Sequence, residues 1–485
     1  MVDRGCGGAA NGCIVHCSVL RTPLTTVIAR SVAAQQSRSM SLPKIGSPGI
    51  REARNDSPAD NERWRIGGVF LLSYLVVELA LSWGQPFPSK FDELEHLSYV
   101  TSLARFGPAT TQFFPGLLLG KAWGSGFGAA QSYINHPPLY YLLLRLLISS
   151  RSQPDFYDVL CLRLVNVAIS TLAIACVISI GILRGLDQRK LLLYCLFSVF
   201  SPPIILIGSI ISNDNLALLG GCLCLLGAQI VSIPPERRIG FILLGAGCAI
   251  ATCAKLTAGL LTASFAAIFL VLECWLRGTR PSAKLLGCLL LVEVAAALPY
   301  VWYIVIFGSP APITQAFVDH YREIAQLWAQ FDGWNPDGKL GVLSYALRFL
   351  YWWLTNWNPV PVMDGLISLP VLVGPLFMVL FALAGWCANV LRLQQSDHLL
   401  VAGGLAMAIV VPINFVFSYK LYTLTGAPPT DATPRYYFPI ALVLIPAAAC
   451  WTIQQLKPSV ITGVTWFLLL SLMVGPAWIA IWSVN

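Results

Sequence analysis

The chain has 485 residues, of which 56% are hydrophobic and only 11% are charged, and its mean hydropathy is +0.70. This apolar content exceeds that of a soluble domain of similar length, so the composition predicts an integral membrane protein. The net charge is +8. The basic residues are scattered through short loops and form no stripe with interleaved aromatic residues, which argues against a nucleic-acid partner.

Residues 1–63 form a leader that is rich in glycine, serine and arginine and contains few large apolar residues. Its apolar run 14–20 is too short and interrupted to be the core of a signal sequence. We expect the leader to be disordered. Met40 lies within it and is an alternative start, while a transit peptide is a second interpretation, favoured by the arginines and serines but not by the glycines.

Apolar runs that are long enough for a helix to cross a hydrocarbon core of about 30 Å recur along the rest of the chain. Such runs predict helices rather than a barrel, because a helix satisfies all its backbone polar groups internally. We therefore predict an all-α fold, a polytopic membrane protein with about 11 transmembrane helices. In chain order the expected spans are 66–83, 159–183, 191–210, 216–233, 239–254, 257–275, 285–307, 366–391, 399–418, 438–453 and 459–480.

The basic residues of the short loops fix an orientation for these spans. If the spans alternate, these residues all fall on one side of the membrane, which the positive-inside rule identifies as cytoplasmic. They are Arg184, Arg189, Lys190, Arg237, Arg238, Arg277, Arg280, Lys284, Arg392 and Lys457.

The segment 137–149, with the sequence PPLYYLLLRLLIS, is apolar but only about 13 residues long, and it contains Arg145. Counting it as a crossing would place the positive loops outside. We therefore predict an interfacial or re-entrant helix, which leaves 84–158 as one long external loop and 308–365 as a second. The predicted transmembrane domain covers residues 64–485.

The sequence FDELEH, residues 91–96, follows the first span and opens a predicted helix, because apolar residues continue after it at helical spacing. Asp92 and His96 are four residues apart and Glu93 and His96 three, so they share one helix face. Carboxylates beside an imidazole can take a proton from a hydroxyl or hold a divalent cation. An acidic first turn that complements the helix dipole explains the carboxylates equally well, but not the histidine.

Two further polar elements lie in predicted external segments. Asn135-His136-Pro137-Pro138 places a histidine ahead of a helix that begins with prolines, where free amides favour an anion such as phosphate. A loop histidine bonded to water is the ordinary alternative. Ser212-Asn213-Asp214-Asn215 forms a turn between two spans, and taken alone it is a common helix cap.

The last two elements carry cations that a lipid phosphate would attract. Lys255 in CAKLTAG lies between two short spans and could instead simply extend to the membrane interface. Arg435 lies in PRYYFP at the outer start of a late span, where its planar guanidinium suits phosphate. An aromatic belt with an interfacial cation is the alternative explanation there.

All five elements fall on the same membrane face under the orientation that the positive loops predict. In this order they resemble the GT-C superfamily of membrane glycosyltransferases, closest to its aminoarabinose transferase and protein mannosyltransferase types. The likeness covers roughly residues 66–451. The segments that carry it are Asp92-Glu93, Asn135-His136-Pro137-Pro138, Cys161-Leu162-Arg163-Leu164-Val165-Asn166, Asp214, Ala254-Lys255-Leu256-Thr257 and Arg435-Tyr436, with histidine at position 136 where the aminoarabinose enzymes have lysine.

This resemblance implies an inverting transfer of a sugar from a polyprenyl-phosphate carrier to a lipid, glycan or protein acceptor. Asp92 would be the general base, with Glu93 as the alternative catalytic carboxylate. The substrate-binding residues it implies are His96, His136, Asp214, Lys255, Arg435 and Tyr436. It requires no certain cofactor, and a divalent metal ion at Asp92, Glu93 and His96 is left open. The expected location is a bacterial inner membrane, with the site on the periplasmic side.

Two other functional classes remain open from the residues alone. A lipid-linked saccharide flippase or transporter would place ionisable residues at mid-membrane depth, and the candidates here are Glu78, Glu273 and Glu293. A polymerase or ligase of O-antigen type would also use a polyprenyl carrier. That class predicts the dominant charged site in a late loop rather than after the first span.

Overall fold

The computed structural model describes most of the chain from Pro58 to Trp482. Most of the predicted leader, 1–57 with Met40, lies outside these described residues, whereas 58–63 form the first turns of a helix. The prediction of a separate leader therefore stays a prediction. The described ranges are 58–89, 92–106, 116–118, 127–131, 136–148, 154–233, 237–278, 281–332, 340–355, 369–391, 397–429, 432–456 and 458–482.

Helices make up almost all of the described secondary structure, with one two-stranded antiparallel sheet of β1 and β2. In chain order, the first elements are α2 (Pro58–Gly84), α3 (Glu93–Phe106), β1 (Gly116–Leu118), β2 (Phe127–Gln131), α4 (Leu139–Arg145), α5 (Phe156–Leu183), α6 (Gln188–Val199) and α7 (Pro202–Gly208). The later elements are α8 (Asp214–Val231), α9 (Arg237–Ala254), α10 (Leu256–Leu276), α11 (Ala283–Phe307), α12 (Gln315–Asp332), α13 (Val342–Thr355), α14 (Leu369–Leu391), α15 (His398–Thr425), a 3-10 turn Pro434–Tyr437, α16 (Phe438–Gln454) and α17 (Pro458–Trp482).

The predicted class, an all-α polytopic membrane protein, is confirmed. Within the described residues, eight helices are long and apolar enough to cross a membrane. Two further predicted spans correspond to α14, with 23 residues, and α17, with 25 residues. Within these helices, Pro375–Leu391 and Val460–Leu472 form shorter apolar segments. As predicted, the apolar segment after His136 does not cross, because α4 has only 7 residues.

One predicted span, 191–210, differs from expectation because it is broken into α6 and α7. Pro202 and Pro203 occupy the first positions of α7, where a missing backbone N–H costs nothing. The same prolines could not continue α6, since each removes a donor and crowds the preceding turn. Because the run 191–210 is apolar throughout, its hydropathy gave no sign of this break between α6 and α7.

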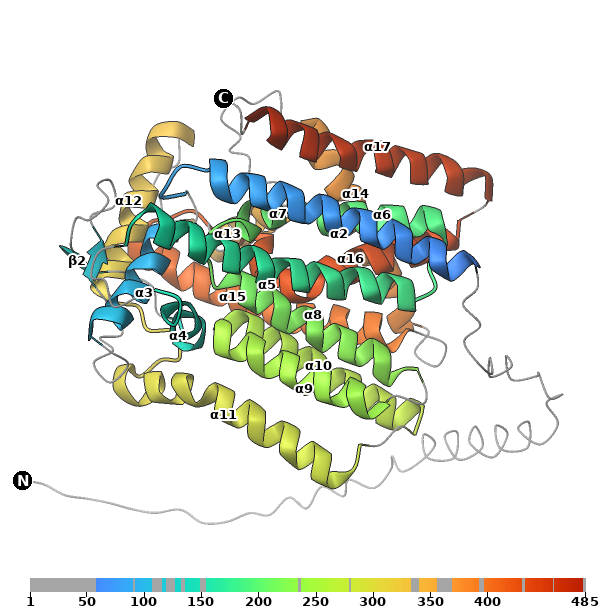
Figure 1. Ribbon diagram of the computed structural model, residues 1–485, viewed down its shortest axis with the longest axis horizontal. Helices are drawn as coiled ribbons and strands as arrows, with labels where there is room; N and C mark the ends of the chain where they lie inside the picture. The colour runs from blue at the N-terminus through green and yellow to red at the C-terminus, as the bar shows by residue number, and fades with distance from the viewer. Residues whose placement is uncertain are drawn as a thin grey trace, which may run out of the picture. The chain divides into compact units, whose positions relative to one another are not determined.

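Small residues bring α8 and α9 unusually close together. A methyl group added at Gly227 would lie 2.3 Å from the backbone nitrogen of Leu244, and one at Gly247 would lie 2.3 Å from that of Cys224. Such backbone-to-backbone contact is the usual way in which membrane helices gain packing energy. The α8–α9 pair lies beside α5, α10 and α16 in the centre of the helical array (Figure 1).

The polar elements gather at one end of these helices. Figure 1 shows α3, α4, β2 and α12 at the same end of the long helices. Helix α16 runs from Phe438 at this end to Gln454 at the other, a distance of about 25 Å for a helix of this length. The array therefore has two chemically different ends, and every predicted site residue belongs to the one that carries α3.

We predict that Gly247→Ala destabilises the protein, because the added methyl meets backbone that cannot rotate away. Overpacking of this kind typically costs about 1–3 kcal/mol. Gly287→Ala in α11 is the matched control, since nothing lies within 4 Å of its added methyl. Thermal unfolding in detergent should show a lowered midpoint for Gly247→Ala and an equal or raised midpoint for Gly287→Ala. Equal midpoints would refute the close α8–α9 packing.

Candidate active site

Four segments that are far apart in the sequence meet at the end of the array that carries α3. The Lys255 Nζ lies 2.6 Å from the Asp214 Oδ1 and 4.2 Å from the centre of the Tyr436 ring. The Arg435 Nη2 lies 3.4 Å from the Asp92 Oδ2. Two carboxylates and two cations therefore alternate across one small region, as the sequence predicted from their common membrane face.

Helix ends position this cluster. Asp214 is the first residue of α8, and Lys255 occupies the extended junction between α9 and α10, with φ −160° and ψ 136°. The Asn213 amide Nδ2 donates to the carbonyl of Ala254 at 2.8 Å and so ties the start of α8 to the end of α9. This bond closes a helix terminus that would otherwise expose a buried carbonyl, and it holds Asp214 opposite Lys255.

Asp92 has an unusual backbone conformation, with φ at 59° in the left-handed region. Non-glycine residues seldom adopt this region, although aspartate tolerates it better than most, and such conformations persist only where the surroundings fix them. The carbonyl of Asp92 accepts the amide of His96 at 3.0 Å and so begins α3. Its side chain is 32% exposed, so the carboxylate can reach a substrate.

Glu93, the other predicted catalytic carboxylate, is instead fully buried and bound on both oxygens. The Arg163 Nε donates to the Glu93 Oε1, and the Arg163 Nη2 donates to the Glu93 Oε2, both at 2.7 Å. The backbone amides of Ile211 and Ser89 also donate to it, at 3.2 and 3.0 Å. A carboxylate held in this way has no lone pair directed at a substrate, so the structure supports a scaffolding role for Glu93 rather than a catalytic one.

Arg163 completes this arrangement by donating to the ends of the first span. Its guanidinium reaches the carbonyls of Ser82, Gln85 and Pro86 at 3.1, 2.9 and 3.3 Å. The pair thereby joins the end of α2, the start of α3, α5 and the turn after α7. In the sequence, Arg163 was noted only as part of a motif. Its contact with Glu93 could not be predicted from residue spacing, because the two residues are 70 positions apart.

We predict that Glu93→Gln acts mainly on stability. Removing one partner of a buried ion pair typically costs about 3–5 kcal/mol, because the remaining charge is left uncompensated. Chemical denaturation should therefore show a large loss for Glu93→Gln and a small one for Asp92→Asn, whose side chain is partly exposed. If Glu93→Gln left stability unchanged but abolished activity, Glu93 would have a catalytic role.

Two histidines and a tyrosine line one side of the cluster. The rings of His96 and His136 stack with their centres 6.1 Å apart, and the His96 Nδ1 lies 2.9 Å from the Tyr141 hydroxyl. Burial lowers the pKa of His96 to about 4, and burial together with nearby Lys255 lowers that of His136. Both imidazoles are therefore neutral at pH 7, so His136 would meet a phosphate as a hydrogen-bond donor rather than as a cation.

Arg435 is the strongest candidate for anion binding. Its side chain is only 18% exposed, and its Nε is buried with no hydrogen-bond acceptor among the described residues. A buried donor without an acceptor costs about 1–3 kcal/mol, so such a group usually marks a place for a ligand or water. The ring of Tyr436 lies 5.2 Å from the Arg435 guanidinium carbon and also contacts Lys255, which holds the two cations together.

Two titratable residues near Asp92 were not among the predicted site residues. Burial and the neighbouring Asp92 raise the pKa of Glu95 from 4.5 to about 7. Burial lowers the pKa of His320 in α12, while Asp92 and Glu323 act in the opposite direction. Glu95 lies in the FDELEH segment, so its position in the sequence could have marked it as a candidate site residue. His320 lies in α12, and no local sequence pattern shows that this helix is near the site.

We predict a pH dependence that belongs to Glu95. Because its pKa in the folded protein is raised to about 7, the folded state holds this proton more tightly than the unfolded state. Stability from this group is fully present below pH 4.5 and is lost as the pH rises to about 7. Unfolding midpoints of Glu95→Gln should fall less than those of the parent protein between pH 5 and pH 7.5. Parallel curves would show that Glu95 titrates normally.

A metal site at Asp92, Glu93 and His96 was left open by the sequence. In the described part of the chain, no group of three or more His, Cys, Asp and Glu side chains is arranged to hold a metal ion. The two oxygens of Glu93 are bonded to Arg163, and His96 is bonded to Tyr141. Asn135, which precedes His136, lies outside the described residues.

Comparisons with known proteins give similarity of fold only. No family model matches the chain, and no curated protein matches it. Among solved structures, the chain is similar to ArnT from Cupriavidus metallidurans bound to undecaprenyl phosphate, with 14% identity and a TM-score of 0.47 over 83% of this chain. It is also similar to the apo oligosaccharyltransferase of Archaeoglobus fulgidus, with 14% identity and a TM-score of 0.44 over 84% of this chain.

The chain spans 62% of the length of ArnT and 55% of that of the oligosaccharyltransferase. Because both TM-scores lie below 0.5, no residue role is taken from either protein.

Proposed function

We propose that this protein is an inverting glycosyltransferase that moves a sugar from a polyprenyl-phosphate carrier to an acceptor hydroxyl. The observation that carries the proposal is the pairing of a partly exposed carboxylate, Asp92, with a buried guanidinium, Arg435, at 3.4 Å. The acid is placed to take a proton. The cation is placed to hold a phosphate beside it, at the membrane end of the helices where a lipid headgroup lies.

Asp92 is the general base in this proposal. It takes the proton of the acceptor hydroxyl as that oxygen attacks the anomeric carbon from the face opposite the leaving group. The bond from the anomeric carbon to the carrier phosphate oxygen breaks, and its electron pair leaves with the phosphate. Arg435 lowers the energy of the Asp92 carboxylate before the reaction, and the partial exposure of Asp92 leaves room for the acceptor.

The leaving phosphate gains charge in the transition state and is stabilised by the nearby cations. The Arg435 Nε supplies a donor that lacks an acceptor among the described residues. Lys255 is held within reach by Asp214 at 2.6 Å and by the face of Tyr436. His136 would add a neutral donor, and its backbone carbonyl is fixed by the Tyr303 hydroxyl at 3.1 Å.

In this proposal helix α12, which lies in the second predicted external loop 308–365, covers the acceptor side of the site. Its Phe317, Tyr321 and Ala325 pack against Leu421 of α15 and against Ala427, which follows that helix. Asp92 raises the pKa of His320 whereas burial lowers it, so this imidazole lies within electrostatic range of the proposed base. His320 would therefore contact the acceptor or orient it, and the identity of the acceptor would depend on α12.

A flippase or transporter is the competing class. Its candidate carboxylates are dispersed. Glu293 accepts from Thr252 at 2.6 Å, and Glu273 pairs with His398 at 2.9 Å and Arg277 at 3.2 Å. Glu78 packs against Gly208 of α7. These acids contact different helices and form no shared pathway among the described residues, whereas the charged residues at the α3 end converge. The proposed enzyme therefore fits the structure better.

We predict that Asp92→Asn abolishes sugar transfer while leaving the protein folded and donor binding within a few-fold of the parent. Asparagine keeps the size of the side chain but cannot take a proton. General-base assistance typically contributes about 10²- to 10⁴-fold, so the loss should appear in the chemical step. Single-turnover transfer from a polyprenyl-linked donor measures that step. Full turnover by Asp92→Asn would remove Asp92 as the base, and full turnover by Glu93→Gln as well would place the base outside both carboxylates.

Arg435→Ala is the contrasting variant in the same assay. The carrier phosphate is negative both before and during transfer, so losing this cation should weaken donor binding as well as the rate. Arg145→Ala is a control of equal charge change, because its Nε donates to the carbonyl of Leu103 rather than to a site residue. Unchanged donor binding in Arg435→Ala would place the phosphate elsewhere.

A further inference from the structure

A cavity lined mainly by charged and polar side chains lies at the end of the helices opposite the candidate active site. Its volume is about 630 Å³. Gln454 at the end of α16 lines it, whereas Arg435 precedes the start of the same helix at the active site. The two sites are therefore separated by the length of α16, about 25 Å. The remaining lining residues are Arg63, Asp187, Gln188, Arg189, Lys190, Ile461, Thr462 and Thr465.

The lining combines cations from separate helices. Arg63 comes from α2, and Arg189 and Lys190 come from the first turn of α6. Among the described residues that line the cavity, Asp187 is the one carboxylate. It is paired with the Lys190 side chain and caps α6 by accepting the Lys190 amide at 3.0 Å. Three cations against one carboxylate leave the cavity positive, which favours an anion.

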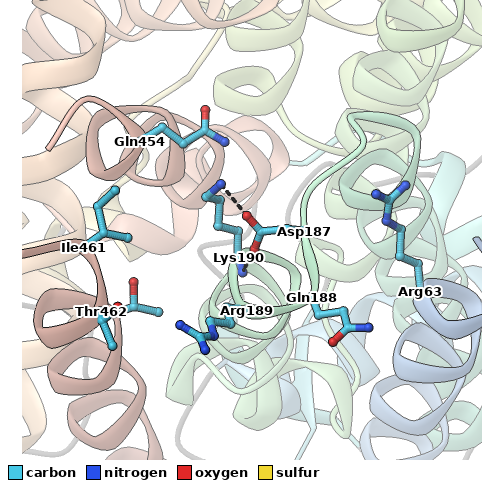
Figure 2. A pocket seen from close by; sticks show the side chains of 9 residues that line it. Arg63, Asp187, Gln188, Arg189, Lys190, Gln454, Ile461 and Thr462 are labelled. Carbon is cyan, nitrogen blue, oxygen red and sulfur yellow. Dashed lines mark hydrogen bonds and ion pairs between the residues drawn. The ribbon is translucent and has the colours of Figure 1, made fainter. Parts of the chain in front are cut away.

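Hydroxyl and amide groups lie on the other side of the cavity. Figure 2 shows Arg63 on one side, Gln454, Ile461 and Thr462 on the other, and the turn from Asp187 to Lys190 between them. Guanidinium groups bind phosphate oxygens with two parallel hydrogen bonds, while hydroxyls and amides suit the alcohol groups of a headgroup. This combination fits a phosphodiester that carries a polar alcohol.

The surface beside the cavity is apolar and exposed. Trp466, Phe467 and Leu470 follow the lining residues on α17 and are 56%, 46% and 63% exposed. A soluble phosphate would make no use of these side chains, whereas the acyl chains of a lipid would cover them. The cavity also lies at the end of the membrane spans that carries the excess of short-loop arginines and lysines, where anionic lipids are attracted.

We propose that this cavity binds the headgroup of an anionic glycerophospholipid from the leaflet opposite the active site. Arg63 and Arg189 hold the phosphodiester, and Thr462 and Gln454 bind the headgroup alcohol. The bound lipid joins α2, α6, α16 and α17 through one anion. This site is separate from the one proposed for the sugar donor and uses none of its residues.

Native mass spectrometry of the full chain in detergent, titrated with phosphatidylglycerol or phosphatidylcholine, tests this proposal. We expect phosphatidylglycerol to bind preferentially, and Arg63→Gln and Arg189→Gln each to weaken that binding about tenfold, the usual effect of losing one charged hydrogen bond. Arg65→Gln is the matched control, since it removes the same charge from an exposed position on α2 that does not line the cavity. Thr462→Val, which keeps every charge, should weaken binding less.

Several results would overturn the proposal. An equal loss in Arg65→Gln would mean that the lipid responds to surface charge rather than to a built site. Binding that survives Arg63→Gln and Arg189→Gln but falls with Arg238→Gln would place the lipid at the smaller basic cavity of about 440 Å³ between α9 and α11. Competition by inorganic phosphate without any binding of phosphatidylglycerol would assign the cavity to a soluble anion.

Discussion

The buried pair of Glu93 and Arg163 is the contact on which the candidate site depends. It fixes the first residues of α3 against α5, the end of α2 and the turn that leads into α8. Asp92 immediately precedes Glu93, so its strained backbone and the direction of its carboxylate follow from where this pair anchors the chain. A charge pair of this kind costs desolvation energy but defines one arrangement of the groups around it, which a reacting carboxylate needs.

Differences in local environment explain why neighbouring acids have different chemistry. Glu93 is bound by Arg163 on both oxygens, and Asp214 is paired with Lys255. Asp92 is partly exposed beside Arg435, and burial raises the pKa of Glu95 to about 7. Environment rather than residue type separates these roles. Among the acids described at this end of the helices, Asp92 is partly exposed and lies beside a cation, and these two features are the physical basis for proposing it as the base.

Much of this arrangement could be predicted from the sequence, because the positive loops and span lengths placed Asp92, His136, Asp214, Lys255 and Arg435 on one membrane face. The partner of Glu93 could not, since it depends on how two helices 70 residues apart pack together. The break between α6 and α7 was hidden by an apolar run, although its prolines were visible. His320 was missed as a site residue because an amphipathic helix gives no sign of which face covers a site.

The most direct measurement of the central claim is mass spectrometry of the lipid that co-purifies with the protein. A site in which Arg435 and Lys255 hold a carrier phosphate should retain a polyprenyl-phosphate species in the parent protein. That species should be depleted in Arg435→Ala and unchanged in Arg189→Gln, whose substitution lies at the other end of the helices. Retention of ordinary phospholipids alone, or of a polyprenyl phosphate that is indifferent to Arg435, would contradict the account.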